Sequence, residues 1–284
     1  MSEPLFILAP PRSCTSVVCA MIGGHPELYA LPETNLFAGE TYADVEKIFA
    51  ARPHLRHGVL RAVAELGLGG QTRENVEAAY AWLEDYADLS TAELYRDLMA
   101  LIEPRAPVDK SPLHVYTPGA IERIRSAFPD ARFLHLARHP RATCESMNRT
   151  RQAGGQGGGV LPEEVWLRPH LRIIEGLDGV KQDNTMFLRA EVLLADPPRY
   201  LRQIAEWLGI DAGAKAVDAM MHPERSPFAA IGPENAQLGN DPDFLESPAL
   251  RPFEEPPSDL DSPLSWGGAA FGDVLKQYAM ILGY

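Results

Sequence analysis

Short apolar runs alternate with helical patterns along most of this chain, and the alternation constrains the fold more than any other feature. The first apolar run, residues 5–9, leads into a turn at residues 10–16 and then into an apolar helix that Gly23 and Gly24 end. Further strands are expected at the end of 107–112 and over 131–137 and 185–194, and helices over 120–128, 139–150 and 200–210. Such alternation predicts an α/β protein with a parallel central sheet.

Length and composition are those of one globular domain over residues 1–284. Hydrophobic residues make up 45% of the chain and charged residues 23%, so a core can form and wholesale disorder is excluded. The chain has 26 Lys and Arg against 39 Asp and Glu, a formal net charge of -13, which argues against nucleic-acid and anionic-membrane partners. An anionic ligand therefore needs a local basic pocket.

Three segments interrupt the alternation. Residues 41–105 carry helical patterns, with a capping box from Ser90 to Glu93, and are expected to form a helical insertion. The glycine-rich stretch 151–159 is expected to be a mobile loop, with a linker as the alternative. Residues 222–265, dense in proline and acidic residues, are expected to be a long irregular arm, and an amphipathic helix follows them.

The cysteines and the first residues narrow the class of protein. Cys14, Cys19 and Cys144 show no CxxC or Cys/His metal spacing, so we expect reduced thiols, without disulfides or a zinc site. The first ten residues contain an acidic residue and only a short apolar run, so we expect neither a signal peptide nor a membrane span there. These features favour a cytoplasmic protein.

The turn after the first expected strand is the first candidate for chemistry. In a parallel sheet, ligands bind at the carboxyl ends of strands, where the next helix offers unpaired N–H groups. The run Arg-Ser-Cys-Thr-Ser at residues 12–16 adds a guanidinium and hydroxyls, which suit a phosphate or sulfate group. The lysine of the GxxxxGK[ST] nucleotide loop is missing. A simple helix cap by Ser13 or Thr15 is the alternative explanation.

A second turn of this kind follows the strand expected at residues 131–137. Arg138 ends that strand, and Pro140 stands where the first turn of a helix tolerates proline. Ser146 lies about two helical turns after Arg138, so both can hold one phosphate only if the chain before the helix bends. Two anion sites at adjacent strand ends of an acidic protein favour a functional pocket over scattered surface charge.

These motifs resemble those of the sulfotransferase family over nearly the whole chain. PPRSCTS after LFILA is similar to the family's 5′-phosphosulfate loop, and Arg138 with Ser146 is similar to its 3′-phosphate motif. Other segments that follow the family's order are LPETNLF, DKSP, FLRAEVLLADP and IAEWLGI. Within the family, VDKSPLHVY and IGPENAQLGNDPDFL most resemble the sulfotransferase domains of olefin-forming polyketide synthase modules.

The resemblance implies a P-loop-like three-layer fold and a specific reaction. A sulfuryl group would move from 3′-phosphoadenosine-5′-phosphosulfate (PAPS) to a hydroxyl of a small molecule or of a β-hydroxyacyl chain on an acyl carrier protein. Adenosine 3′,5′-bisphosphate would be the product, and no metal would be needed. Arg12 and Lys110 would stabilise the charge that grows on the bridging oxygen. The residues expected to bind the nucleotide are Arg12, Ser13, Cys14, Thr15, Ser16, Arg138 and Ser146.

Three residues are candidates for the base that takes the acceptor's proton. His57, in the helical insertion, has a reference pKa of about 6.5 and is narrowly favoured. Glu33 comes second, because it matches the position from which related protein-tyrosine sulfotransferases supply a glutamate. His114 lies four residues after Lys110 and is the third. A capping carboxylate or an exposed imidazole is the alternative role in each case.

Two departures from the family pattern leave other functions open. Cys14 stands where glycine is usual, so the loop either tolerates a side chain there or has a negative φ. Ala190 replaces a common tyrosine of an expected strand. A non-catalytic nucleotide-binding homologue is one alternative, and a metabolite kinase is another, although its P-loop lysine and Mg²⁺ ligands are not visible. We expect Arg149 and Arg151 to face an acidic carrier protein.

Overall fold

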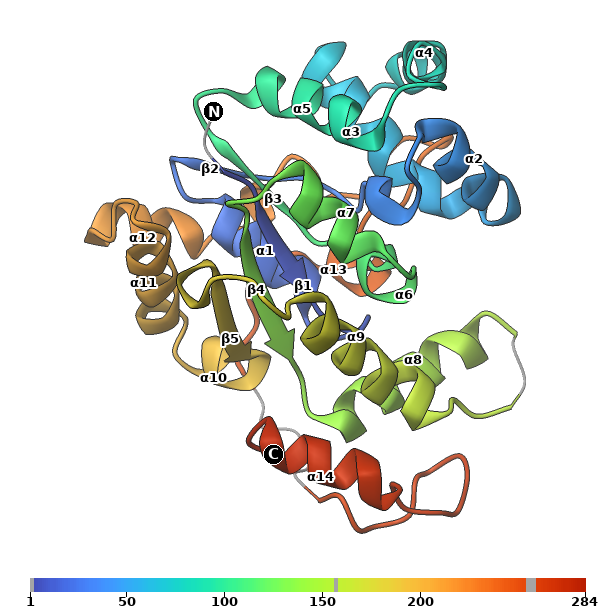
Figure 1. The fold of residues 1–284 in the computed structure, drawn as a ribbon, viewed down its shortest axis with the longest axis vertical. Coiled ribbons are helices and arrows are strands. Elements are labelled where there is room, and N and C mark those ends of the chain that lie inside the picture. Colours follow the sequence, from blue (N-terminus) through green and yellow to red (C-terminus); the bar gives the residue numbers. More distant parts are fainter. Residues whose placement is uncertain (1–2, 156–157, 254–258) are drawn as a thin grey trace.

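Five parallel strands form the centre of the computed structural model within its described residues, 3–155, 158–253 and 259–284 (Figure 1). They lie in the order β2-β3-β1-β4-β5, and each neighbouring pair is parallel. The strands are β1 (Leu5–Leu8), β2 (Leu28–Ala30), β3 (Ala106–Asp109), β4 (Arg132–Ala137) and β5 (Thr185–Arg189). The predicted α/β fold with a parallel central sheet is confirmed.

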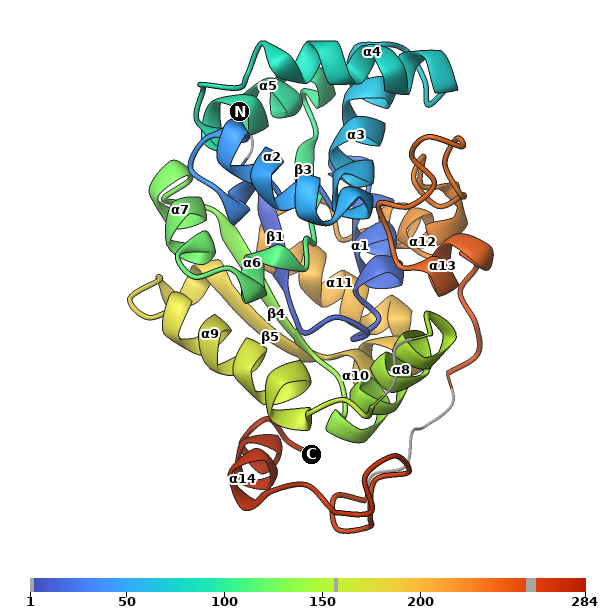
Figure 2. The same cartoon turned by 90° about the vertical axis from the view of Figure 1, so that its right-hand side faces the viewer.

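The central strand β1 shows why both faces of the sheet are covered. All of its residues are buried, and successive side chains point to opposite faces. Phe6 and Leu8 pack with the helices of residues 41–105, whereas Leu5 and Ile7 pack with helix α1 (Thr15–Gly23). A strand buried on both faces needs a continuous apolar run, which LFIL provides. The outcome is the expected three layers of helix, sheet and helix (Figure 2).

The helices of residues 41–105 lie together over one face of the sheet (Figure 1). In its capping box, the Glu93 N–H donates to Ser90 Oγ at 3.2 Å and the Ser90 N–H donates to the Glu93 carboxylate at 2.9 Å. That box starts the last helix of the segment, as predicted. The elements here are α2 (Tyr42–Ala51), the 3-10 turn η2 (Pro53–Arg56), α3 (His57–Gly67), α4 (Arg73–Glu84) and α5 (Thr91–Ile102).

The other helices lie between strands or belong to the C-terminal part. Helices α11 (Pro197–Leu208) and α12 (Ala214–Met220) pack beside α1 on the second face of the sheet. None of the helices in the described ranges is long and apolar enough to cross a membrane. These elements are η1 (Leu36–Ala38), α6 (Leu113–Tyr116), α7 (Ala120–Ala127), α8 (Pro140–Ala153), the π-helical η3 (Glu163–Leu167), α9 (Arg168–Gly176), η4 (Gln182–Asn184), α10 (Ala190–Ala195), α11 (Pro197–Leu208), α12 (Ala214–Met220), η5 (Pro223–Arg225), α13 (Pro242–Glu246) and α14 (Asp273–Ile281).

Two expected boundaries are wrong. The strand expected at 185–194 ends at Arg189, and its second half is helix α10, because a short apolar run does not distinguish strand from helix. Helix α8 continues to Ala153, into the glycine-rich stretch expected to be a loop. Residues 156–157 of that stretch lie outside the described residues.

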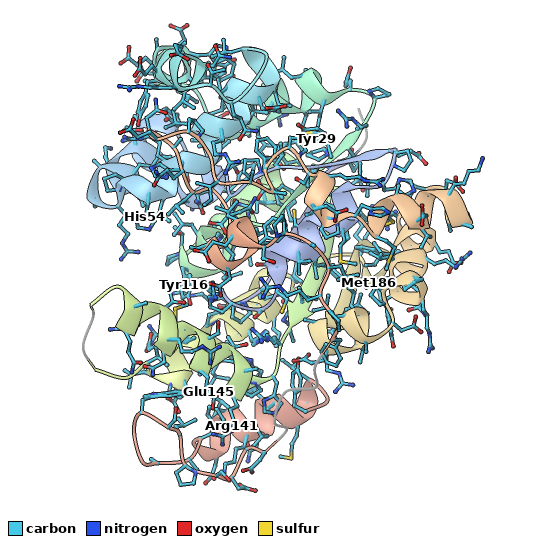
Figure 3. All side chains as sticks on the ribbon, turned by 180° about the vertical axis from the view of Figure 1, so that it is seen from behind. Tyr29, His54, Tyr116, Arg141, Glu145 and Met186 are labelled. Atoms are coloured by element: carbon cyan, nitrogen blue, oxygen red, sulfur yellow. The ribbon has the colours of Figure 1, made fainter. Side chains whose placement is uncertain are left out.

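The arm expected at residues 222–265 contains the short helices η5 and α13 and is otherwise irregular where it is described; residues 254–258 lie outside that part. Arg141 of α8 anchors the end of the arm. It donates from Nε to the carbonyl of Asp259 at 2.9 Å and from Nη2 to that of Ser262 at 2.7 Å. Figure 3 shows Arg141 beside this C-terminal segment.

Candidate active site

The turn between β1 and α1 is held in an unusual backbone conformation. Arg12 has φ 67° and Cys14 has φ 60°, both in the left-handed region that favours glycine. Cys14 thus keeps the conformation a glycine would adopt, and the alternative of a negative φ is wrong. The hydroxyl of buried Ser13 has no partner among the described residues, so Ser13 does not cap α1. The first N–H groups of α1 have no side-chain cap and stay available to a ligand.

The second turn, between β4 and α8, lies against the first. Arg138 donates from Nη1 to the backbone carbonyl of Arg12 at 2.8 Å. Arg12 donates from Nε to Ser146 Oγ at 2.9 Å. Pro140 begins α8, as the sequence predicted. The two turns meet because β1 and β4 are parallel neighbours, so their carboxyl ends share one edge of the sheet.

A cavity of about 360 Å³ lies between these turns, α10 and the C-terminal arm. Ser13 does not line it, but every other residue predicted to bind the nucleotide does. Those lining residues are Arg12, Cys14, Thr15, Ser16, Arg138 and Ser146. The cavity therefore has the guanidinium groups, hydroxyls and helix N-terminus that an anionic ligand requires.

Sequence reasoning missed what the arm adds to this cavity. Arg251 adds a further guanidinium to those of Arg12 and Arg138, and Leu250 and Phe253 contribute apolar surface. Ala190, which replaces the tyrosine of the family pattern, lines the cavity as the first residue of α10 rather than from a strand. Arg149 also lines it. The arm lies about a hundred residues beyond the second turn and has no periodic pattern. No local signal in the sequence therefore indicated that the arm folds back to line this cavity.

The guanidinium of Arg12 is paired with two carboxylates of the arm. Its Nη1 contacts Asp241 and its Nη2 contacts Asp243. The backbone N–H of Asp241 also donates to Ser16 Oγ at 3.1 Å. With Ser146 on Nε, all three nitrogens of Arg12 have protein partners. The sequence predicted Arg12 in the site but not these carboxylates.

Lys110 and Glu33 form a second polar pair, just beyond the end of β3. The Lys110 ammonium contacts Glu33 Oε1, and the side chains are 2% and 18% exposed. The backbone of Glu33 packs closely on α3, because a Cβ at Gly58 would lie 2.0 Å from the Glu33 carbonyl oxygen. The structure thus brings together two of the predicted catalytic residues, although neither lines the cavity beside Arg12.

A buried carboxylate supports this pair. Asp109, fully buried at the end of β3, accepts hydrogen bonds from Thr34 Oγ1 and Ser111 Oγ, both at 2.7 Å. Ser111 Oγ in turn accepts the backbone N–H of Asn35 at 2.9 Å. Burial raises the pKa of Asp109 to about 6, against the lowering effect of these hydroxyls and of Lys110. The network fixes the two residues after Glu33 to the two residues that flank Lys110.

His57 begins α3 and lies against the arm. Its Nδ1 accepts the backbone N–H of Leu238 at 3.2 Å, so the neutral ring carries its proton on Nε2. Burial, followed by the charges of His54, Arg61 and Arg56, lowers the pKa of His57 below its ordinary 6.5.

His114 is not brought into the site. Its ring is 1% exposed and packs against Phe6 and Phe37 at centroid distances of 5.7 and 5.8 Å. Neither ring nitrogen has a hydrogen-bond partner among the described residues, and burial lowers the pKa of His114 to about 3. An imidazole enclosed in this way belongs to the core. Spacing of four residues from Lys110 could not reveal which way the short helix α6 turns the ring.

A protein-family model agrees with the resemblance seen in the sequence. The family model described as "Sulfotransferase family" matches residues 4–213, from β1 to the loop before α12. No curated protein sequence matches the chain. The matched range contains both turns, Glu33, His57 and Lys110, whereas the arm lies beyond it.

Solved structures similar to this chain include two that match it along its whole length. One is a sulfotransferase domain from the curacin biosynthetic pathway, 24% identical, with a TM-score of 0.78 and 98% of that chain covered. Another is a sulfotransferase domain from the Synechococcus PCC 7002 olefin synthase, 26% identical, with a TM-score of 0.78 and 96% covered. A Mycobacterium tuberculosis H37Rv sulfotransferase is 17% identical with a TM-score of 0.51, over 78% of this chain and 71% of that one.

Proposed function

The chain belongs to the sulfotransferase family, and from this premise we propose that it transfers a sulfuryl group from PAPS to the hydroxyl of a β-hydroxyacyl chain, free or carried by an acyl carrier protein. The observation that carries the donor assignment is the cavity between the two turns, which gathers Arg12, Arg138 and Ser146 at the N-terminus of α1. Family membership favours sulfuryl transfer over the kinase alternative.

In the proposed complex the two turns divide the donor between them. Thr15, Ser16 and the first N–H groups of α1 would hold the 5′-phosphosulfate, where the helix dipole favours negative charge. Arg138 and Ser146 would hold the 3′-phosphate, with charge-assisted hydrogen bonds of the kind that guanidinium groups form with phosphate. The apolar surface of Leu250 and Phe253 suits the adenine ring.

Transfer is an in-line displacement at sulfur, and its barrier falls when the reactants are positioned and the growing charge is stabilised. The bond from sulfur to the bridging phosphate oxygen breaks while the acceptor oxygen forms a new bond to sulfur. Negative charge then grows on the bridging oxygen. Arg12 and Lys110 are the cations proposed to stabilise it, and both are nearly buried, where a charge interacts more strongly than in water.

The acceptor hydroxyl must lose its proton to a base within hydrogen-bond reach. Glu33 offers a carboxylate that is partly exposed and already oriented by Lys110. His57 offers Nε2, but with Leu238 N–H on Nδ1 that nitrogen carries a proton and cannot accept another. In the arrangement of this structure, Glu33 is therefore the group able to accept the proton, and His57 becomes able only if Leu238 N–H leaves it.

The polyketide-type acceptor rests on likeness to two domains named for the curacin pathway and for an olefin synthase. The test is to incubate the protein with PAPS and a panel of hydroxylated acyl chains, free and attached to a carrier protein, and to search for sulfated products by mass spectrometry. Calorimetry with adenosine 3′,5′-bisphosphate runs in parallel. Bisphosphate binding without any product would support the non-catalytic homologue, and the absence of both would refute the proposal.

A further inference from the structure

One short segment of the arm touches both halves of the candidate site. We call residues 238–243 the strap. At one end, Asp241 and Asp243 pair with Arg12. At the other, the Leu238 N–H donates to His57 Nδ1 at 3.2 Å. Between them, the carbonyl of Gly239 accepts the backbone N–H of Glu33 at 2.7 Å. A displacement of the strap therefore reaches the donor loop and both surviving base candidates.

The donor and the strap compete for the same guanidinium. Arg12 has one nitrogen on Ser146, one on Asp241 and one on Asp243. Three of the five N–H groups of Arg12 are used in this way. A phosphate or sulfate oxygen on either of the other two would lie beside a carboxylate, and the repulsion between the two anions favours loss of the carboxylate contact. Asp243 is 73% exposed and can move into water easily, whereas Asp241 is 24% exposed and is also tied to Ser16 through its backbone.

The other end of the strap sets the tautomer of His57. While Leu238 donates to Nδ1, the neutral ring has its proton on Nε2. The charged or titratable groups around the ring are His54 and Arg56 from η2 and Arg61 from α3, and the strap contributes only a backbone N–H there. When that N–H withdraws, the proton can move to Nδ1 and Nε2 becomes an acceptor. Among the residues that the structure describes, the Leu238 N–H is the only hydrogen-bond partner of the His57 ring.

We propose that Asp241 is a positioning residue that ties occupancy of the donor site to the tautomer of His57. This inference rests on the proposed function, since it takes an anionic nucleotide as the ligand of Arg12. Without the nucleotide, Asp241 holds the strap on Arg12 and Leu238 keeps His57 in its Nε2–H form. With the nucleotide, Arg12 turns to the new anion, the strap loosens, and His57 is freed to accept a proton.

The test compares the wild-type chain with Asp241→Asn, using adenosine 3′,5′-bisphosphate as the probe. Asparagine is as good a helix N-cap as aspartate, so α13 keeps its start while the ion pair is lost. The matched control is Asp130→Asn, which removes the same charge from an exposed pair with Lys181 outside the cavity. Calorimetry gives the affinity, and ¹⁵N NMR of the histidine rings, assigned with His57→Gln, gives the tautomer.

We expect the bisphosphate to bind Asp241→Asn on the order of tenfold more tightly than wild type, because no carboxylate has to be displaced. We also expect it to shift His57 Nδ1 from acceptor to N–H in the wild type, and the free Asp241→Asn variant to show that shift already. Equal affinities in Asp241→Asn and Asp130→Asn, or a His57 signal that bisphosphate leaves unmoved, would overturn the proposal. If the wild type bound no bisphosphate at all, the donor assignment itself would fail, and this inference with it.

Discussion

Arg12 Nε and Ser146 Oγ lie 2.9 Å apart although 134 positions separate them in the chain. Each belongs to a different anion-binding turn, and the hydrogen bond joins the two turns directly. The site predicted from separate motifs is thus one continuous surface. Its residues can be tested one at a time.

Arg138→Ala is expected to weaken bisphosphate binding by about 1.5–3 kcal/mol, the range for a hydrogen bond to a charged group. Arg138 lines the cavity and also holds the Arg12 carbonyl, so its loss removes a ligand and loosens the first turn. Calorimetry measures the effect. Arg199→Ala, an exposed position of α11 that does not line the cavity, is the control. An unchanged dissociation constant in Arg138→Ala would remove this residue from the donor site.

Lys110→Ala is expected to lower turnover more than it weakens donor binding. The proposed partner of Lys110 is charge that develops only during transfer, and such an interaction affects kcat rather than ground-state affinity. The comparison is between the loss in kcat from product formation and the loss in bisphosphate affinity from calorimetry. Equal losses would mean that Lys110 only anchors the bound phosphate.

The pH profile at saturating substrates separates the two bases. A base must be unprotonated to act, so the rate falls as pH falls through its pKa. The pKa of His57 is lowered, so an acidic limb of the profile caused by protonation of His57 would lie below pH 6.5, the ordinary pKa of histidine. If His57 is the base, His57→Ala removes that limb and most of the activity. If Glu33 is the base, the limb survives in His57→Ala and disappears in Glu33→Gln.

Asp109 gives stability a pH dependence of unusual sign. Its pKa rises from 3.8 to about 6 on folding, so between these values the folded chain binds more protons than the unfolded chain. Its contribution is therefore fully present below pH 3.8 and is lost as pH rises through about 6. Denaturation from pH 4 to 7 should show wild type losing on the order of 3 kcal/mol relative to Asp109→Asn. Parallel curves would contradict this.

The left-handed backbone at Cys14 predicts a difference between two small replacements. Cys14→Gly and Cys14→Ala both remove the thiol, but only glycine adopts a φ of 60° without a steric cost. The glycine variant should be more stable than the alanine variant by about 1 kcal/mol, measured by chemical denaturation. The opposite order would show that the loop changes conformation once the thiol is absent.

The sequence revealed the parts of the fold and site that depend on neighbouring residues. The buried run of β1, the capping box of α5 and the turn that begins at Pro140 all carry local signals, and the structure has each of them. The arm carries none. Asp241 pairs with Arg12 across 229 positions. The sequence of an irregular acidic segment does not indicate which cation it contacts in the fold.

The direction of individual side chains was the second feature of the site that the sequence could not predict. From the sequence, His57 is the first and His114 the third candidate base, and each is an imidazole near a recognised motif. A helix of four residues turned the His114 ring into the core between Phe6 and Phe37, and only the three-dimensional packing decides that. The same packing placed His57 against the strap.

Arg61 links helix α3 to the arm, and this link has a consequence for engineering the protein. It is 1% exposed, and from α3 it donates to the carbonyls of Leu238 at 2.9 Å and Ala230 at 2.8 Å. Burying a guanidinium is tolerated only while it keeps hydrogen-bond partners, so substitutions in α3 and in this stretch of the arm affect each other. Substitutions in α3 are therefore expected to change donor affinity as well. Selection on this chain should recover substitutions in α3 and the arm as pairs rather than singly.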